Sequence, residues 1–377
     1  MRPLIKRTLQ EHIENKCFKG KIILLIGPRQ VGKSTLLHGI CKKFGEYLFL
    51  DGDDPDVRSK LDNPNFEQLK LLVGRYSLIF IDEAQRIKNI GLMLKMIHDR
   101  MAGVQVLVSG SSALDLNAQT QESLTGRKWE YQLYPISWEE WYRHLDYLSL
   151  SQQLESRIVY GMYPEVLNQP GEEKQILKEL TMSYLYKDIL ALSGIKKPDV
   201  LEKLVVALAY QIGSEVSYNE LAQLLRIDKN TVMNYIDLLE KAYVVYRLNP
   251  FSSNQRNEIK TNRKVYFYDT GIRNAVISNF DSLQLRPDKG ALWENFVINE
   301  RMKYLHYHQQ DVQHFFWRAI QGGEVDLLEQ KGNQLQAYEI KWNSKSKVKL
   351  PASFSKHYDT IPIAVHPENF IHFVVNE

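Results

Sequence analysis

Apolar runs alternate with amphipathic stretches in the first third of the chain. Helical spacing is found over residues 1–20 and 33–44, and it also fills the gaps between the apolar runs. The runs themselves are continuous, as in strands buried on both faces, and cover 21–26, 47–51, 77–83 and 104–112. Strands that alternate with helices predict an α/β fold, with a parallel sheet covered by helices on both faces.

The middle of the chain has a different pattern. Residues 137–187 are helical and rich in Trp and Tyr, as in a lid or connector, and a linker is predicted at 194–198. Residues 216–248 then give helix, turn, helix and strand, which predicts a winged helix-turn-helix. The apolar side of this unit is expected to be formed by Leu221, Leu224, Leu225, Val232, Ile236 and Leu239.

The last part of the chain, from about Lys289, predicts a further small α/β unit. A helix over 291–304 precedes three strands with the sequences HFFWRA, EVDLLEQ and LQAYEIKW. With 377 residues, 44% of them hydrophobic, the chain is long enough for two or three domains of about 150 residues. We expect domains over 1–190, 198–275 and 276–377.

The composition says more about the cellular compartment of the protein than about its function. The 48 Lys and Arg against 45 Asp and Glu give a net charge of +3, which neither requires nor excludes nucleic acid. Cys17 and Cys41 are too few for a disulfide framework or a zinc site, so free thiols in a reducing cytosol are expected. No apolar run approaches about 18 residues and the N-terminus lacks the apolar core of a signal peptide, so we expect a cytoplasmic protein without membrane contact.

A glycine-rich loop, GPRQVGKST, stands between the first strand and the helix that follows. It matches the spacing G-x-x-x-x-G-K-[ST] of a loop whose backbone N–H groups bind phosphates. Lys33 is expected to reach the outer phosphates of ATP, and the Ser34 hydroxyl to bind Mg²⁺. The predicted nucleotide-binding residues are Gly27, Pro28, Arg29, Gln30, Val31, Gly32, Lys33, Ser34 and Thr35.

The strand SLIFIDE ends in two acids that belong at the same edge of the sheet. Asp82 is expected to hold Mg²⁺ and Glu83 to polarise the attacking water, so the pair predicts hydrolysis of ATP. The strand VQVLVSGSS brings Ser109 or Ser111 to this edge, either to sense the γ-phosphate or as part of a serine-rich turn. Arg127 is either an arginine finger, in its own subunit or a neighbour's, or an ordinary surface arginine.

These motifs, together with LYPISWEEW, YDTGIRNAV and GALWENFVINE, resemble the prokaryotic AAA-type ATPases that carry a C-terminal domain of unknown function with a nuclease-like fold. The resemblance covers residues 1 to about 190 for the ATPase part and about 200 to 350 for the C-terminal part. It implies that Lys33, Ser34, Asp82 and Glu83 bind and hydrolyse ATP. ATPases of this type often assemble as rings, so self-association is an open expectation, as is a monomer with an internal finger.

A second constellation lies near the C-terminus, in GGEVDLLEQKGNQLQAYEIKW. A β-hairpin is expected to bring Asp326 beside Glu339 and Lys341, which share a face of their strand. The two carboxylates then hold Mg²⁺ while the lysine orients a water. This arrangement is similar to the PD-(D/E)XK phosphodiesterase family, with its restriction-endonuclease-like fold, in which a helix glutamate often joins the site, and Glu294 occupies the matching place. A salt-bridged hairpin without catalysis is the alternative.

Basic and polar side chains near both C-terminal units suit DNA. They are Lys229, Asn230, Thr231 and Asn234 on the second helix of the helix-turn-helix, Arg247, Arg256, Lys260, Arg263 and Lys264 around the wing, and Lys341, Lys345, Lys347, Lys349 and Lys356 interleaved with Trp342 and Tyr358. A helix-turn-helix that only packs beside the ATPase domain and a solvated lysine-rich loop are the alternatives. Two functions follow: a DNA-associated ATPase with a nuclease-like domain, or a nucleotide-switched protein-interaction module in which no DNA is cut. Salt-dependent retention on DNA separates them.

Overall fold

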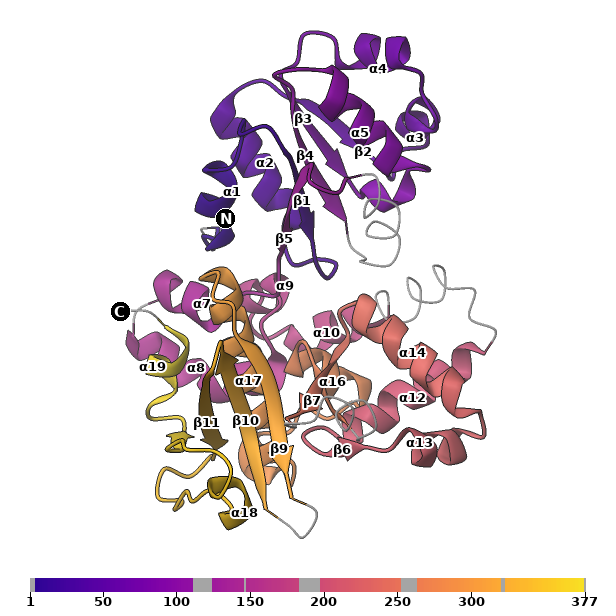
Figure 1. Cartoon of the computed structure of the whole chain (residues 1–377). Coiled ribbons are helices and arrows are strands. Elements are labelled where there is room, and N and C mark those ends of the chain that lie inside the picture. The colour runs from indigo at the N-terminus through magenta and orange to yellow at the C-terminus, as the bar shows by residue number, and fades with distance from the viewer. Residues whose placement is uncertain are drawn as a thin grey trace. The chain divides into compact units, whose positions relative to one another are not determined.

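The structure is a computed structural model that describes residues 4–110, 124–145, 147–182, 197–251, 263–319 and 323–375. The chain folds into two compact units (Figure 1). The first is built from residues up to Pro135, and the second mainly from Ile136 onward. None of the described helices is long and apolar enough to cross a bilayer.

The first unit contains a five-stranded parallel sheet in the order β2-β3-β4-β1-β5. The first four strands confirm the predicted ones, whereas β5 lies where no strand was expected. All five residues of β1 are buried, since this strand is flanked on both sides and covered on both faces. The strands are β1 (Ile22–Ile26), β2 (Leu48–Asp51), β3 (Leu78–Asp82), β4 (Gln105–Gly110) and β5 (Lys128–Gln132).

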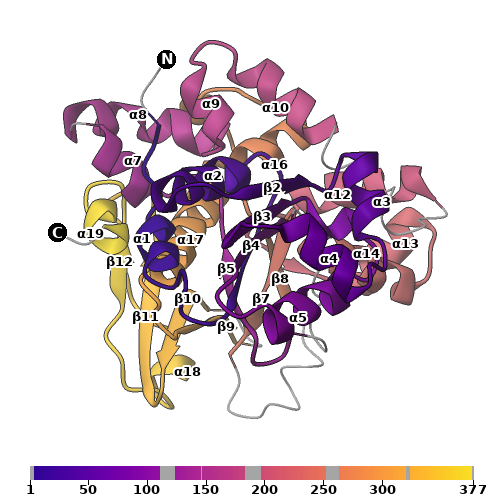
Figure 2. The same cartoon turned by 90° about the horizontal axis from the view of Figure 1, so that it is seen from above.

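Helices cover both faces of this sheet (Figure 2). On one face, α3 (Pro55–Leu61), α4 (Phe66–Val73) and α5 (Ile90–Arg100) bury apolar side chains against alternate residues of the strands. On the other face lies α2 (Lys33–Phe44), whose His38 contacts the ring of Phe80. The remaining elements are α1 (Leu9–Glu14), shorter than the helix predicted over 1–20, and the 3-10 turn η1 (Ala84–Arg86).

The second unit begins with four helices that were predicted to belong to the ATPase domain. They are α7 (Trp138–His144), α8 (Tyr147–Tyr160), α9 (Pro164–Asn168) and α10 (Glu173–Thr181). Both α8 and α10 contact α16 (Thr270–Val276), because their apolar faces, with Ile158 and Leu177, are buried within this unit. The division between the compact units therefore lies near residue 135 and not near 190.

One mixed sheet of seven strands runs through the second unit, in the order β12-β11-β10-β9-β7-β8-β6. Because β7 pairs with β8 on one side and in parallel with β9 on the other, the strands predicted for the wing and for the last α/β unit form one sheet. No break between sheets corresponds to the predicted boundary at 275/276. The strands are β6 (Glu215–Val216), β7 (Val245–Pro250), β8 (Arg263–Phe267), β9 (Gln313–Arg318), β10 (Glu324–Lys331), β11 (Gln334–Ile340) and β12 (Ile363–Val365).

The helices around this sheet follow the predicted order. Two helices, α13 (Tyr218–Leu225) and α14 (Lys229–Lys241), lie where the helices of the helix-turn-helix were predicted, and α12 (Pro198–Tyr210) precedes them. Leu224 was expected in the core but is 65% exposed. The buried side of α13 is formed by Tyr218, Leu221 and Ala222, and Leu224 does not belong to it. Further along lie the 3-10 turn η3 (Leu283–Leu285), α17 (Lys289–Tyr307), α18 (Ala352–Ser355) and α19 (Phe370–Val374).

Candidate functional site

The glycine-rich loop joins the carboxyl end of β1 to the first turn of α2. Gly27 has φ +149°, and a Cβ at this position would lie 2.1 Å from the carbonyl oxygen of Leu133, so a side chain does not fit. Gly32, with φ +93°, has a left-handed backbone that suits glycine, and Gln30 also has a positive φ. The loop therefore turns tightly around the N-terminus of α2, the place where helices bind anions.

Lys33 lies inside this turn. Its Nζ donates to the carbonyl oxygens of Gly27 at 3.0 Å and Pro28 at 2.6 Å, and the residue is 4% exposed. Burial lowers the pKa of the Lys33 ammonium to about 8, although the carboxylates of Glu83 and Asp82 act in the opposite direction. The loop and the first turn of α2 thus bring Lys33 together with the hydroxyls of Ser34 and Thr35. The remaining loop residues, Arg29 and Val31, belong to the same short segment.

The two acids predicted at the sheet edge lie at the end of β3. Asp82 Oδ1 accepts a hydrogen bond from the Ser109 hydroxyl and another, at 3.1 Å, from the backbone N–H of Glu83. Glu83 has a left-handed backbone with φ +46°, and Gln85 donates to its Oε2. Ser109 lies on the neighbouring strand β4 and is fully buried, so its contact with Asp82 is shielded from solvent. Ser111 lies outside the described residues.

A close backbone contact beside this edge was not predicted. In the register of β2 and β3, Asp51 lies opposite Asp82, and the N–H of Gly52 donates to the Asp82 carbonyl at 2.9 Å. A Cβ on Gly52 would lie 2.5 Å from the Glu83 carbonyl oxygen, so only glycine permits this approach. The sequence signal was the glycine that directly follows a strand, in LDGDDPD.

The donor atoms at this edge suit Mg²⁺. Ser34 and Asp82 offer a hydroxyl and a carboxylate, the hard oxygen ligands that Mg²⁺ prefers, and Mg²⁺ in nucleotide sites takes few protein ligands besides phosphates and water. In the described parts of the chain no cluster of three or more His, Cys, Asp or Glu is arranged to hold a metal ion. Bound there, Mg²⁺ would neutralise charge on the β- and γ-phosphates.

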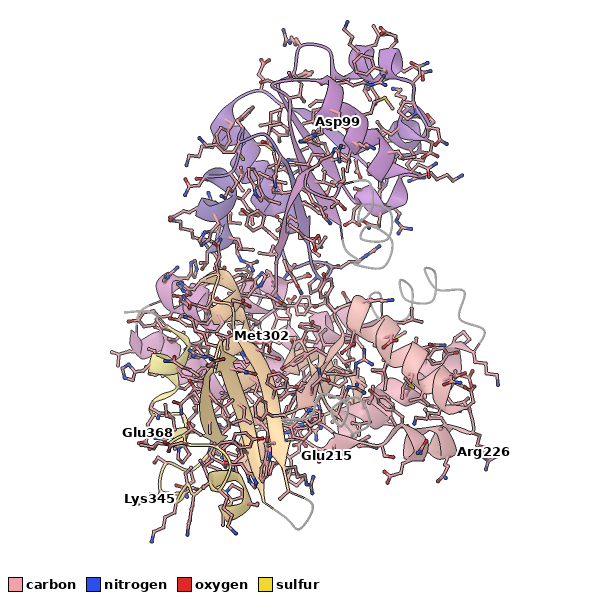
Figure 3. The ribbon with its side chains drawn as sticks, viewed as in Figure 1. Asp99, Glu215, Arg226, Met302, Lys345 and Glu368 are labelled. Carbon is pink, nitrogen blue, oxygen red and sulfur yellow. The ribbon has the colours of Figure 1, made fainter. Side chains whose placement is uncertain are left out.

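Arg127 lies at the other end of the sheet. The N–H of Ile22, the first residue of β1, donates to the Arg127 carbonyl, and β5 runs parallel to β1 from that point. The five residues of β1 span roughly 16 Å at about 3.3 Å per residue, which separates Arg127 from the phosphate loop. Its guanidinium pairs with Asp99 at 2.8 Å, near the end of α5 (Figure 3). A finger in its own subunit is therefore wrong, and one towards a neighbour stays a prediction.

Arg7, which precedes α1, belongs to the nucleotide edge and was missed. It is 6% exposed, and its two terminal nitrogens donate to the carbonyl oxygens of Val31 and Tyr134, each at 2.6 Å. One contact is in the phosphate loop and the other is 127 residues away in sequence, so no local pattern could indicate the pairing.

The C-terminal constellation is assembled on the β10–β11 hairpin. Leu327 pairs with Tyr338, which places Asp326 opposite Glu339, one position along the antiparallel ladder. Lys341 Nζ lies 2.9 Å from Asp326 Oδ2 and 2.9 Å from Glu339 Oε2. The hairpin thus brings the three predicted residues together, with the lysine ammonium between the two carboxylates.

Glu294, on α17, is held by side chains from β8. Its Oε1 accepts from Lys264 Nζ at 2.9 Å and from the Tyr266 hydroxyl, and Lys264 also pairs with Glu324 at the start of β10. Lys264 is 1% exposed, so its prediction as a DNA contact on the wing is wrong: the lysine points inward to neutralise two acids. The sequence did not show whether Lys264 points inward or outward, because these positions alternate along a strand.

Burial and neighbouring charges shift the pKa values of the acids in this cluster. Burial, with the nearby carboxylate of Asp326, raises the pKa of Glu339 to about 7. Burial also raises the pKa of Glu294, against the effect of Lys264. Glu339 Oε1 is buried and accepts no hydrogen bond, which leaves one oxygen available to a cation. The donor set of Asp326 and Glu339 therefore fits a divalent ion through this oxygen, beside the Lys341 ammonium.

The expected DNA-binding side chains divide into two groups. Lys229, Asn230 and Asn234 are exposed on α14, Thr231 is half-buried there, and the lysines at 345, 347, 349 and 356 are exposed (Figure 3 labels Lys345). Arg247 instead pairs with Asp237 at 2.7 Å and with Glu240, so its charge is compensated within the unit. Arg263 donates to Asn249, while Arg256 and Lys260 lie outside the described residues.

Family models match three successive parts of the chain. Residues 19–142 match the AAA domain, and residues 151–283 and 289–376 match two domains of unknown function, DUF8612 and DUF4143. An uncharacterized protein of Mycobacterium tuberculosis is 28% identical over 91% of this chain and 75% of its own length. Another, of Methanocaldococcus jannaschii, is 25% identical over 90% and 80%.

Among solved structures, the Walker-type ATPase of Pyrococcus abyssi is similar, with a TM-score of 0.50 and 15% identity. The match covers 73% of this chain and 96% of that one. This likeness bears on the fold, and the fold agrees with the parallel sheet and phosphate loop of the first unit. Residues 19–142 are therefore similar in sequence to the AAA domain, and the first unit has the fold of a P-loop nucleotide-binding domain.

Proposed function

We propose that the protein hydrolyses ATP with Mg²⁺ at the edge formed by the phosphate loop and the ends of β3 and β4. The observation that carries this proposal is the convergence of Lys33, Asp82 and Glu83 at one edge of the parallel sheet, where the loop after β1 and the end of β3 both lie. Lys33 binds the outer phosphates, Ser34 and Asp82 hold the Mg²⁺ shell, and Glu83 polarises the attacking water.

The roles of the two acids follow from their surroundings. Asp82 is fixed by Ser109 and by the N–H of Glu83, as suits a group that must hold a metal shell in one place. Glu83 stands one residue later on a left-handed backbone and receives the Gln85 amide, which orients its carboxylate.

The test is the rate of ATP hydrolysis by the wild type and by Glu83→Gln, with and without DNA, across a salt series. We expect the exchange to lower kcat by about 100-fold or more, because general base catalysis contributes about 10²–10⁴. Glu46→Gln, which alters an exposed acid paired with the exposed Arg75, is the matched control and should keep the wild-type rate. A Glu83→Gln variant as active as the control would refute the assignment.

A second function, a Mg²⁺-dependent phosphodiesterase acting on DNA, is favoured by the orphaned Glu339 oxygen. The order of elements from α17 through β9, β10, β11 and α18 to β12, with β11 parallel to β12, also suits the PD-(D/E)XK fold. Asp326 and Glu339 would hold the ion, Lys341 would orient the water, and Glu294 would join from α17. Exposed lysines after β11 and polar residues on α14 would contact the DNA backbone.

Cleavage of plasmid DNA with Mg²⁺ or Mn²⁺, by wild type and Asp326→Ala, tests this second function. Loss of cleavage in Asp326→Ala but not in Asp359→Ala, an acid outside the cluster, supports it. If no DNA is cut and ATP hydrolysis ignores DNA at every salt concentration, the nucleotide-switched interaction module is the better description. That module predicts different conformations with ATP and ADP.

A further inference from the structure

We propose that Arg7 is a positioning residue of the nucleotide site, and that it couples the phosphate loop to the segment through which the chain leaves the first unit. The proposal rests on the nucleotide binding proposed above. No motif assigns a role to Arg7, which stands 20 residues before the loop begins.

The first step is the geometry of one guanidinium bound to two carbonyls. Arg7 Nη1 donates to the Val31 carbonyl and Nη2 to the Tyr134 carbonyl, each at 2.6 Å, in a buried place. The two nitrogens belong to one rigid plane, so the separation of the two carbonyl oxygens is fixed by the side chain. Hydrogen bonds from a charged donor are also about twice as strong as neutral ones.

The second step concerns the loop itself. In a trans peptide the C=O and N–H groups point in opposite directions, so a Val31 carbonyl held towards Arg7 turns the N–H of Gly32 away from it. Gly32 immediately precedes Lys33, at the part of the loop whose N–H groups bind phosphate. Arg7 therefore orients a phosphate donor without touching the ligand.

The third step concerns the exit of the chain. The N–H of Leu133 donates to the Ile26 carbonyl at 2.8 Å, and the Leu133 carbonyl packs directly on Gly27. Residues 133–134 thus contact the start of the loop through Leu133 and its end through Arg7. Pro135, where the main stretch of the first unit ends, follows at once. A loop that tightens around phosphate therefore also tightens this segment.

Two variants test the proposal, Arg7→Met, which keeps the volume, and Arg7→Lys, which keeps the charge but cannot span both carbonyls. The matched control is Lys6→Met, which removes a neighbouring exposed lysine paired with exposed Glu11. The readouts are the Kd for mant-ADP, the split of kcat and KM for ATP, and hydrogen exchange of a peptide covering 127–138 with and without ADP. Thermal unfolding of each apoprotein reports on folding.

We expect Arg7→Met to weaken mant-ADP binding by about tenfold or more, with Arg7→Lys in between and the control unchanged. ADP should slow exchange in 127–138 in the wild type but not in Arg7→Met. A folded Arg7→Met with wild-type Kd and wild-type protection would overturn the proposal while leaving ATP hydrolysis intact. So would an Arg7→Lys that fails to fold, since Arg7 would then be structural. A wild type that binds no mant-ADP would refute nucleotide binding, and this proposal with it.

Discussion

The nucleotide edge and the C-terminal acidic cluster are built in opposite ways. At the nucleotide edge, nine consecutive residues supply the lysine and the hydroxyls, and one strand end supplies both acids. In the C-terminal cluster, the charged groups come from β8, α17, β10 and the end of β11, and only the pairs Glu324/Asp326 and Glu339/Lys341 are close in sequence. A site formed by a continuous loop can be recognised as a motif, whereas a site formed by distant strands depends on how they pair.

The two sites also differ in how their charges are balanced. Lys33 faces Asp82 and Glu83, but its own hydrogen bonds go to the backbone carbonyls of Gly27 and Pro28. In the C-terminal cluster, by contrast, the ammonium groups of Lys264 and Lys341 pair directly with carboxylates. The two lysines of this cluster face four carboxylates, those of Glu294, Glu324, Asp326 and Glu339, so they offset only part of the negative charge that could attract a cation.

The largest effect on ligand binding is expected from a substitution in the phosphate loop. Lys33→Met should weaken ATP binding by about 100-fold or more, because the proposed role of this lysine is to bind the outer phosphates. In the wild type, affinity should also fall as pH rises through about 8, because the lowered pKa of Lys33 means that the ammonium loses its proton there and not near 10.5. Titration calorimetry between pH 7 and 9.5 measures both. A pH-independent affinity in the wild type would contradict the buried position of the ammonium.

A large loss of stability is expected from Lys264→Met, since it leaves Glu294 and Glu324 without their buried cation. Removing one partner of a buried ion pair costs about 3–5 kcal/mol in the free energy of unfolding. Arg318→Met, at a half-exposed arginine that also pairs with Glu324, should cost less than about 1 kcal/mol.

Urea unfolding of these two variants and of the double variant Lys264→Met/Glu294→Gln measures the difference. The double variant should recover part of the loss, because one of the two uncompensated acids is removed with the lysine. Equal stabilities of Lys264→Met and Arg318→Met would show that Lys264 is exposed in solution, as a wing residue would be.

A smaller, pH-dependent effect is expected at Glu339. Its pKa is raised to about 7, so folding favours the protonated acid, and the free energy of unfolding should fall as pH rises from about 4.5 to above 7. Glu339→Gln removes this dependence and should be about 1–3 kcal/mol more stable than the wild type at pH 8, with little difference at pH 5. Thermal unfolding at the two pH values tests this. A stabilisation equal at both would point to packing and not to charge.

The smallest effect is expected from Arg127→Ala. Because Arg127 lies at the far end of β1 from the phosphate loop, the rate of ATP hydrolysis should stay within about twofold of the wild type at low protein concentration. Asp99→Ala, which removes its partner, should behave alike. If the rate of Arg127→Ala falls only at concentrations where the wild type self-associates, the arginine acts on a neighbouring subunit. Arg127 of one subunit would then lie at the nucleotide edge of the next.

The sequence alone was sufficient for the phosphate loop and for four of the five strands of the first sheet. Both follow from local rules: glycine spacing sets the loop, and continuous apolar runs set buried parallel strands. The hairpin of Asp326 and Glu339 was predictable for the same reason, because its two strands are neighbours in sequence and alternation fixes which residues share a face.

Only the tertiary structure decided the rest. Strand β5 was missed because KWEYQ mixes polar and apolar residues, with none of them fully buried. It joins the sheet by pairing in parallel with β1, more than 100 residues earlier, and this pairing carries Arg127 away from the nucleotide. Lys264, Tyr266 and Arg7 acquire their roles through partners between 24 and 127 residues away. Periodicity shows which face of an element is apolar, but only packing shows which distant group meets a charged side chain.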